Sequence, residues 1–267
     1  MPHLEDVNLQ ANSLRLAFAD PEFMLRPEAR GIRLQMELLK PDVVQAEAGV
    51  HHTVVVFGSA RFVSQEVAQV HLTQARQSQD PAQIAQAEMA VRNAAYYEAA
   101  RTFAGLVAQA CAHRPAHERF TICTGGGPGI MEAANRGAKE AGAESVALNI
   151  ALPHEQHPNP YVTEGLSFKF HYFAIRKMHF MMRAKALVAF PGGYGTLDEL
   201  FEILTLIQTH KTHKVPVLLF GSDYWQQVIN FDHMLAHGTI SPEDAACFQM
   251  VDTPQAAWEQ VQSFHGT

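Results

Sequence analysis

The chain has 267 residues, of which 47% are hydrophobic and 18% are charged, and its formal net charge is −7 at pH 7. This composition is ordinary for a globular enzyme, and the length suits one large domain or a domain with an appendage, with room for a sizeable core. The negative charge excludes broad electrostatic binding to nucleic acid, because no positive field is available to attract a polyphosphate. No stretch reaches the roughly 20 apolar residues of a membrane span, and the first residues lack the basic and apolar runs of a secretory signal. The cysteines lie far apart and fit neither a disulfide framework nor a zinc site, so we expect a cytoplasmic protein without bound metal.

Residues 1–50 carry short helical patterns that are interrupted by Pro21, Pro27 and Pro41. This segment is too small for a hydrophobic core of its own. We therefore expect an N-terminal helical appendage over residues 1–50, followed by a main domain over residues 51–267.

The first strong strand pattern is the β-branched run at 53–57, which ends at Gly58 and Ser59. Small residues at this point are typical either of an ordinary tight turn or of a turn that lets a ligand pass. A helical insert follows over residues 62–112, in which Asp80 is a good N-cap ahead of a proline. Because this insert is longer than a strand crossover requires, we interpret it as a candidate oligomer contact.

A second strand is predicted at 120–124, and a helix is predicted from Pro128 to Ala141. The turn between them is not a dinucleotide fingerprint, because Ile130 occupies the last glycine position, and it is not a P-loop. Its glycines indicate either a ligand-binding turn or tight packing of the helix on the sheet. These glycines are Gly125, Gly126 and Gly127.

The third strand, at 145–150, leads into a proline-rich stretch at 152–160 that we expect to overhang the strand ends as a loop. A helix is predicted over 173–184, and we assign its methionines to packing. Arg176 and Lys177 on this helix are adjacent cations. They belong either to a phosphate or ribose site or to a solvated helix face.

The most informative pattern runs from residue 186 to residue 207. A buried strand at 186–190 precedes a glycine-rich turn, and apolar residues then recur at helical spacing from Leu197 to Ile207. Glycine lets a backbone approach a ligand closely, and a helix start supplies free N–H groups and the positive end of the helix dipole. The pattern predicts a phosphate on Gly193, Gly195 and Thr196, with Glu199 one helical turn further on. Alternatively, Thr196 and Glu199 form a capping box, in which the carboxylate only satisfies its own helix.

Strands at 215–220 and 248–251 and helices at 224–237 and 254–264 complete the alternating pattern. This alternation predicts a doubly wound, mostly parallel α/β sheet with helices on both faces. Ligands bind such sheets beyond the carboxyl ends of the strands. The turns after Phe57, Thr124 and Phe190 all lie at such ends, so one crevice is expected to collect all three.

Three segments in this order resemble the Lonely Guy (LOG) family of cytokinin-activating phosphoribohydrolases, long mislabelled as lysine decarboxylases. Residues 191–199 read Pro-Gly-Gly-Tyr-Gly-Thr-Leu-Asp-Glu and resemble the signature PGGxGTxxE. Residues 124–135 resemble the first glycine-rich turn of the family, and Arg176 with Lys177 stands where the family has its Arg-Lys pair. The resemblance covers about residues 52–262. It implies that residues 51–267 form a Rossmann-like, nucleotide-binding catalytic domain.

The resemblance implies that Glu199 and Arg176 form the catalytic pair. It implies that Lys177, Thr205 and the loop residue Glu155 complete the substrate site. No cofactor is expected. The other residues expected to bind substrate belong to the three turns, and they are Gly58, Ser59, Gly125, Gly126, Gly127, Gly192, Gly193, Tyr194, Gly195 and Thr196.

Hydrolysis of the N-glycosidic bond of a nucleoside 5′-monophosphate fits these residues. The anomeric carbon becomes oxocarbenium-like as the base departs, and a carboxylate stabilises that charge or activates water. The resemblance implies cytokinin riboside 5′-monophosphate or AMP as substrate, with free base and ribose 5-phosphate as products. It also implies a homodimer or a larger homo-oligomer. Two alternatives stay open: a broad-specificity nucleotide 5′-monophosphate nucleosidase, and a nucleotide-binding carrier or sensor without turnover.

Overall fold

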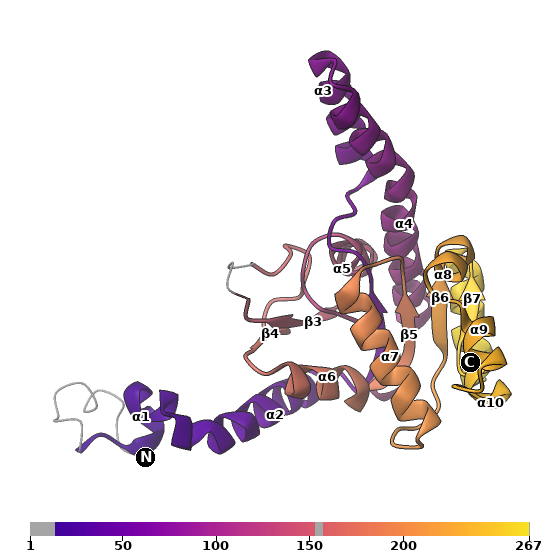
Figure 1. The fold of residues 1–267 in the computed structure, drawn as a ribbon. Coiled ribbons are helices and arrows are strands. Elements are labelled where there is room, and N and C mark those ends of the chain that lie inside the picture. Colours follow the sequence, from indigo (N-terminus) through magenta and orange to yellow (C-terminus); the bar gives the residue numbers. More distant parts are fainter. Residues whose placement is uncertain (1–13, 153–156, 267) are drawn as a thin grey trace.

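The computed structural model describes residues 14–152 and 157–266, and its centre is a seven-stranded sheet in which all neighbouring strands are parallel (Figure 1). The order across the sheet is β4-β3-β2-β1-β5-β6-β7. The strands are β1 (His52–Phe57), β2 (Phe120–Thr124), β3 (Ser145–Ile150), β4 (Ser167–Phe170), β5 (Ala184–Ala189), β6 (Val217–Phe220) and β7 (Gln249–Val251). The predicted doubly wound parallel sheet is confirmed.

Side chains of β1 point alternately to the two faces of the sheet, so that Val54 and Val56 enter one core and Val55 and Phe57 enter the other. The first core is covered by α4 (Pro81–Cys111), α5 (Ile130–Glu140) and α11 (Pro254–His265). The second is covered by α6 (Phe173–Met182), α7 (Tyr194–Gln208), α8 (Ser222–Val228) and α9 (Phe231–Ala236). The remaining helical elements are η3 (Ala17–Ala19), α1 (Pro21–Leu25), η4 (Pro27–Ala29), α2 (Arg30–Glu47), α3 (Gln65–Ser78), η5 (Ala116–Glu118) and α10 (Pro242–Ala245).

The chain reverses its direction of winding between β1 and β5, which lie next to each other although β2, β3 and β4 intervene in the sequence. Connections from two such neighbouring strands leave toward opposite faces of the sheet, and this opens a crevice beyond their carboxyl ends. The turns after β1 and β5 are those that begin at Gly58 and Phe190. The fold therefore places the glycine-rich signature turn at the expected ligand position.

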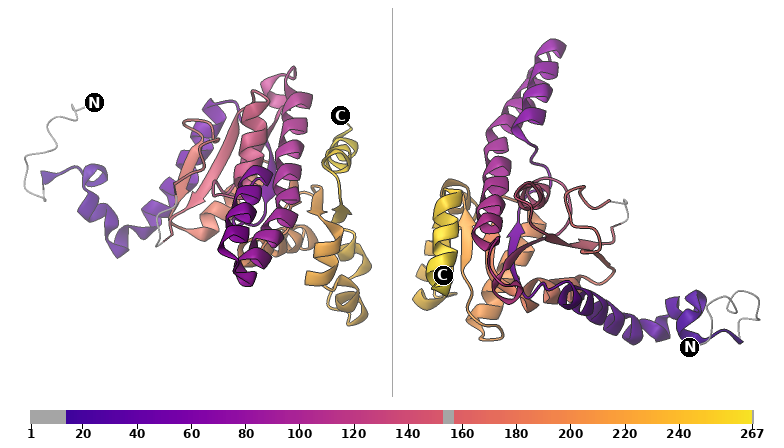
Figure 2. Two further views of the ribbon diagram at one scale, coloured as in Figure 1. Left: turned by 90° about the horizontal axis from the view of Figure 1, so that it is seen from above. Right: turned by 180° about the vertical axis from the view of Figure 1, so that it is seen from behind.

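Two helical segments stand out from the sheet and its covering helices (Figure 2). The α3 and α4 helices pack against each other as a hairpin, within the predicted insert, and α4 continues down onto the sheet. The α2 helix runs from the N-terminal side and packs on α6. The division into an appendage at 1–50 and a domain at 51–267 stays a prediction. None of the helices in the described ranges has the length and apolar content needed to cross a lipid bilayer.

Pro41 does not interrupt α2, contrary to the prediction. Proline removes one N–H, and inside a helix it frees the carbonyl four residues earlier, here that of Glu37. His179 of α6 lies 3.2 Å from this carbonyl oxygen through Nε2, which must be the donor because a carbonyl only accepts. Burial lowers the pKa of His179, although its bond to the carbonyl of Glu37 acts in the opposite direction. A contact with another helix thus compensates the proline.

Two other predictions differ from the structure. The helix predicted at 224–237 is two helices, α8 and α9, because Asn230 leaves helical geometry and its side chain accepts the N–H of His233 as a cap. The edge strand β4 was not predicted. It has only four residues, of which Phe168 and Phe170 are buried and Lys169 is exposed. So short an alternation is a poor signal in the sequence.

Candidate active site

Ser59 ties the three predicted turns together. Its N–H donates to the carbonyl of Pro191 at 2.9 Å, in the turn after β5. Its carbonyl accepts the N–H of Ile130 at 3.1 Å, where α5 begins after β2. The carboxyl ends of β2, β1 and β5 therefore meet at one place, as the sequence predicted.

The signature turn opens directly into α7, whose N-cap is Gly193. No side chain caps this helix, so the capping box of Thr196 and Glu199 is not formed. The first intrahelical bond is that of Leu197 to the carbonyl of Gly193. The N–H groups of residues 193–196 consequently have no acceptor in the described part of the chain and are available to an anion.

Gly192 admits the close packing of this turn. A Cβ atom at Gly192 would lie 2.2 Å from Oγ1 of Thr196 and 3.1 Å from the backbone nitrogen of Ser59. Gly193 and Gly195 are different, because a Cβ on either meets no atom within 4 Å. These two glycines border open space at the helix start, where a ligand would approach.

Arg176 of α6 and Glu199 of α7 form an ion pair beside this helix start. Nη1 of Arg176 donates to Oε1 of Glu199 at 3.0 Å, and the two side chains are only 9% and 13% exposed. The Nε of Arg176 donates to the carbonyl of Leu148 at 2.7 Å, and its guanidinium lies over the ring of Phe180. The carbonyl of Leu148 and the ring of Phe180 thus fix the guanidinium of Arg176, which in turn fixes the carboxylate of Glu199.

Burial raises the pKa of Glu199 to about 7, although the positive charge of Arg176 acts in the opposite direction. Burial also lowers the pKa of Arg176, but a guanidinium remains charged in any range where enzymes work. A carboxyl group poised near neutrality in a cleft is typical of catalytic sites. Glu199 can therefore exist in both protonation states under physiological conditions.

Lys177 lies close to this pair, but its ammonium group already forms ion pairs with two other carboxylates. Its Nζ lies 2.8 Å from Oδ1 of Asp198 and 2.7 Å from Oε2 of Glu202. Burial acts to lower the pKa of Lys177, but its bonds to these two carboxylates outweigh that effect and raise it. The sequence did not identify Asp198 and Glu202 as its partners. The available signal was the spacing of these two carboxylates, which lie four residues apart and so share one face of α7.

The glycines after β2 make contacts within the protein, in addition to their predicted role at a ligand. A Cβ at Gly125 would lie 2.5 Å from Nη2 of Arg176, so this glycine makes room for the guanidinium. The carbonyls of Gly126 and Gly127 accept from Nδ2 of Asn159 at 3.3 and 3.1 Å. Asn159 also bonds Oδ1 of Asn135, which is buried on α5. Asn159 lies in the loop after β3, where no sequence pattern singled it out.

Some predicted site residues are not brought together with Glu199. Gly58 packs against Ile130, and Tyr194 is 93% exposed at the first position of α7. The hydroxyl of Thr205 donates back to the carbonyl of Phe201 at 2.7 Å. Six residues turn a helix by about 240° beyond one full turn, so Thr205 and Glu199 lie on different faces of α7. Glu155 lies outside the described residues.

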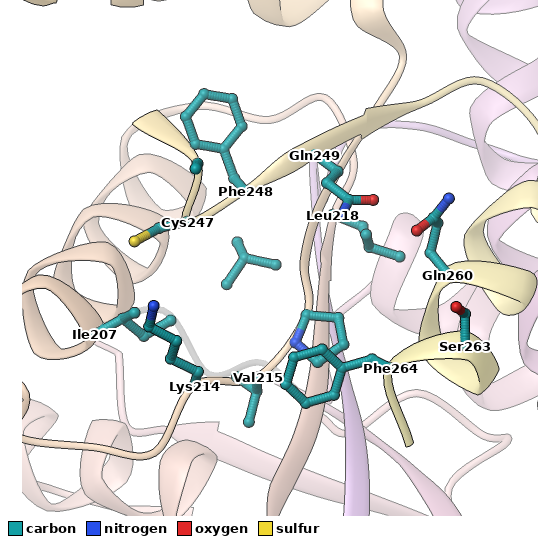
Figure 3. Close-up of a pocket in the computed structure, with 13 residues that line it drawn as sticks. Ile207, Lys214, Val215, Leu218, Cys247, Phe248, Gln249, Gln260, Ser263 and Phe264 are labelled. Atoms are coloured by element: carbon teal, nitrogen blue, oxygen red, sulfur yellow. The ribbon is translucent and has the colours of Figure 1, made fainter. Parts of the chain in front are cut away.

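The groove of Figure 3 lies elsewhere in the molecule. It is lined by the amino ends of β6 and β7, with Val217 and Gln249, and by Lys214, Cys247 and Phe264 (Figure 3). The signature turn is at the carboxyl ends of the same sheet. Within residues 14–152 and 157–266, no group of three or more His, Cys, Asp or Glu side chains is arranged to hold a metal ion.

Comparison with known proteins bears on the same segments. The model of a protein family described as "Possible lysine decarboxylase" matches residues 131–261. The probable cytokinin riboside 5′-monophosphate phosphoribohydrolase LOGL3 of Oryza sativa subsp. japonica is 32% identical over 90 residues, which are 33% of this chain and 43% of that protein. The cytokinin riboside 5′-monophosphate phosphoribohydrolase LOG7 of Arabidopsis thaliana is 42% identical over 69 residues, 25% of this chain and 31% of that protein. These matches confirm the resemblance to the Lonely Guy family.

A further relative extends the picture beyond plant enzymes. The pyrimidine/purine nucleotide 5′-monophosphate nucleosidase of Escherichia coli strain K12 is 30% identical over 147 residues, 48% of this chain and 32% of that protein. The chain thus spans less than half the length of each of these relatives. A solved structure of the molybdenum cofactor binding protein from Rippkaea orientalis aligns with 80% of this chain and with 96% of that protein's chain. The TM-score is 0.50 and the sequence identity is 16%. At that identity, the likeness concerns the fold alone.

Proposed function

We propose that the protein hydrolyses the N-glycosidic bond of a nucleoside 5′-monophosphate and releases the free base and ribose 5-phosphate. The observation that carries this proposal is the buried carboxylate of Glu199, held by Arg176 beside a helix start with free amides. The relatives named as phosphoribohydrolases and as a nucleotide nucleosidase support the same reaction class.

In the proposed complex, the 5′-phosphate lies on the N–H groups of Gly193, Gly195 and Thr196. These groups and the positive end of the dipole of α7 favour an anion at this place. The phosphate is remote from the bond that breaks. Its binding energy serves to align the anomeric carbon with Glu199, which lies one helical turn further on.

The ionised carboxylate of Glu199 then faces the anomeric carbon. The electron pair of the C1′–N bond leaves with the base, which takes up a proton, and the oxygen of water bonds to C1′. Glu199 stabilises the positive charge that develops at C1′ or accepts the proton of that water. Arg176 orients this carboxylate and favours its ionised form, against the effect of burial.

Lysine decarboxylation, the reaction in the description of the matching family, has less support. A Schiff-base lysine needs a lowered pKa so that its amine is free to attack. Lys177, the lysine beside this site, is paired with two carboxylates, which raise its pKa. This arrangement favours a permanently charged lysine that anchors α6 to α7.

Substrate choice distinguishes the remaining alternatives, and a nucleotide panel tests them together. Cytokinin riboside 5′-monophosphates, AMP and pyrimidine monophosphates are incubated with the protein, and free base and ribose 5-phosphate are measured by chromatography. Preference for isopentenyladenosine monophosphate supports the cytokinin role, and similar turnover of all nucleotides supports a broad nucleosidase. A rise in melting temperature with AMP but without any released base supports a carrier or sensor and refutes the hydrolase.

We also propose that the protein is a homodimer or larger homo-oligomer. Support comes from the outer face of α2, opposite the buried Pro41 and Gln45. Apolar side chains recur there at a 4-3-4 spacing, the seam that lets two helices interlock, over a helix about 27 Å long. These side chains are Ile32, Met36, Leu39 and Val43, between 41% and 62% exposed. Sedimentation velocity of wild type and Leu39→Glu tests this: a shift to a smaller species supports the proposal, and a monomeric wild type refutes it.

A cytoplasmic location also remains part of the proposal. It rests on the spacing of the three cysteines, which offers no disulfide framework.

A further inference from the structure

Three successive carbonyls of the signature turn are each held by a different donor. The carbonyl of Pro191 accepts from the N–H of Ser59 at 2.9 Å, and that of Gly193 accepts from the N–H of Leu197 at 3.0 Å. Between them, the carbonyl of Gly192 accepts from the phenolic hydroxyl of Tyr224 at 2.7 Å. Two of the three donors are backbone amides, which are present whatever the side chain of the residue. The Tyr224 bond is the one that depends on the side chain.

This bond determines where the next amide points. In a trans peptide, the C=O of one residue and the N–H of the next point in opposite directions, and the described residues contain no cis peptide. With the Gly192 carbonyl directed at Tyr224, the N–H of Gly193 points away from it. Tyr224 follows β6, which flanks β5 on the side opposite β1. The amide is thus turned away from Tyr224 and from the helix that carries it.

Tyr224 is itself fixed in place. It lies at the start of α8 and contacts the ring of Trp225 edge-on, with 5.3 Å between ring centroids. Trp225 is fully buried, and its Nε1 donates to the carbonyls of Ala189 at 3.2 Å and Phe220 at 3.0 Å. These bonds attach α8 to the ends of β5 and β6, so the hydroxyl of Tyr224 is presented to the turn by a rigid support.

We propose that Tyr224 is a positioning residue for the phosphate site: it orients the Gly192–Gly193 peptide so that the N–H of Gly193 can bond a phosphate oxygen. The inference rests on the proposed function only in that the ligand carries a phosphate. Without the hydroxyl, this peptide is free to rotate, because both of its glycines tolerate other backbone angles. The amide would then be oriented only after the ligand binds, at a cost in affinity.

The test compares Tyr224→Phe with Ser222→Ala. Tyr224→Phe keeps the ring and loses one hydroxyl. Ser222 lies on the same helix, where its hydroxyl bonds Asp252 at 2.8 and 3.0 Å. Ser222→Ala therefore disturbs α8 to a similar degree without touching the turn. Melting temperatures are recorded for both variants, and calorimetry measures the binding of ribose 5-phosphate and of inorganic phosphate, neither of which requires turnover.

We expect Tyr224→Phe to weaken binding of ribose 5-phosphate about 5- to 10-fold, as the loss of one hydrogen bond predicts, with Ser222→Ala within about twofold of wild type. With a nucleotide substrate, KM should rise by a similar factor while kcat changes less, because phosphate binding is common to the ground and transition states. Unchanged affinity in Tyr224→Phe, or an equal loss in both variants, overturns the inference. So does a wild type that binds neither probe. A wild type that binds ribose 5-phosphate but cleaves no nucleotide refutes the hydrolase and leaves the role of Tyr224 standing.

Discussion

Arg176 donates to Glu199 at 3.0 Å across the gap between α6 and α7, in a place where both side chains are almost closed to water. Buried ion pairs of this kind seldom add much stability, because removing two charges from water offsets their attraction. We therefore propose a role in chemistry for the pair, and the predictions below separate that role from a structural one.

The pH dependence of turnover should report Glu199. The reaction needs its ionised form, and its pKa is raised to about 7. We expect kcat/KM to rise with pH through a midpoint near 7 and then to level, since kcat/KM reports groups of the free enzyme. Rates for AMP between pH 5 and pH 9 check this. A profile that falls over the same range would assign Glu199 the role of a proton donor instead.

The stability of the protein should respond to the same titration. Because the folded pKa of Glu199 lies above the value of about 4.5 expected when unfolded, the folded state binds the extra proton between pH 4.5 and 7. Stability from this group is therefore fully present below that window and is lost as pH rises through 7. Glu199→Gln lacks this loss, so its melting temperature relative to wild type should be higher at pH 8 than at pH 5. A difference that does not change with pH would contradict the raised pKa.

Removal of the arginine should reveal how it controls the carboxylate. Arg176→Ala leaves Glu199 buried without a counter-charge and leaves the carbonyl of Leu148 without its donor. We expect a loss of about 3–5 kcal/mol in the free energy of unfolding at pH 8, as for other broken buried pairs. The midpoint of the remaining kcat/KM profile should shift upward, since the attraction that favoured the ionised form is gone. Chemical denaturation and the pH profile measure the two effects. An unchanged midpoint would remove Arg176 from this role.

The α2 helix should matter to the site through Glu37. Its carboxylate accepts the N–H groups of His171 and Tyr172 at 3.0 and 3.1 Å, at the start of the helix that carries Arg176. Glu37→Ala should lower the free energy of unfolding by about 1–2 kcal/mol, as for a lost helix cap, and should reduce kcat/KM with it. Glu47→Ala is the matched control, because Glu47 is exposed on the same helix. Equal effects of the two variants would show that Glu37 has no special contact with the site.

The sequence predicted what depends on local pattern. The strands predicted at 53–57, 120–124 and 145–150 are confirmed, as is the helix predicted from Leu197 to Ile207. The turns after Phe57, Thr124 and Phe190 meet as predicted. Burial and glycine placement leave a local record of these features in the sequence. Contacts across the fold leave no such record. Three contacts depend on residues far apart in the chain. His179 bonds the carbonyl that Pro41 leaves free, Lys177 pairs with Asp198 and Glu202, and Asn159 bonds the turn after β2. Thr205 is a different case, because its six-residue spacing from Glu199 is local information that already places the two residues on different faces of α7.

Release of ribose 5-phosphate by Glu199→Gln is the most direct test of the central claim. Wild type, Glu199→Gln and Glu202→Gln are incubated with the nucleotide that wild type cleaves fastest. The released base and ribose 5-phosphate are quantified by chromatography. Glu202 is the control, because it lies on the same helix and its carboxylate pairs with Lys177. We predict a loss of about 10²–10⁴-fold in Glu199→Gln, with Glu202→Gln close to wild type and all three proteins folded. Full turnover by a folded Glu199→Gln would show that this carboxylate does not act on the glycosidic bond.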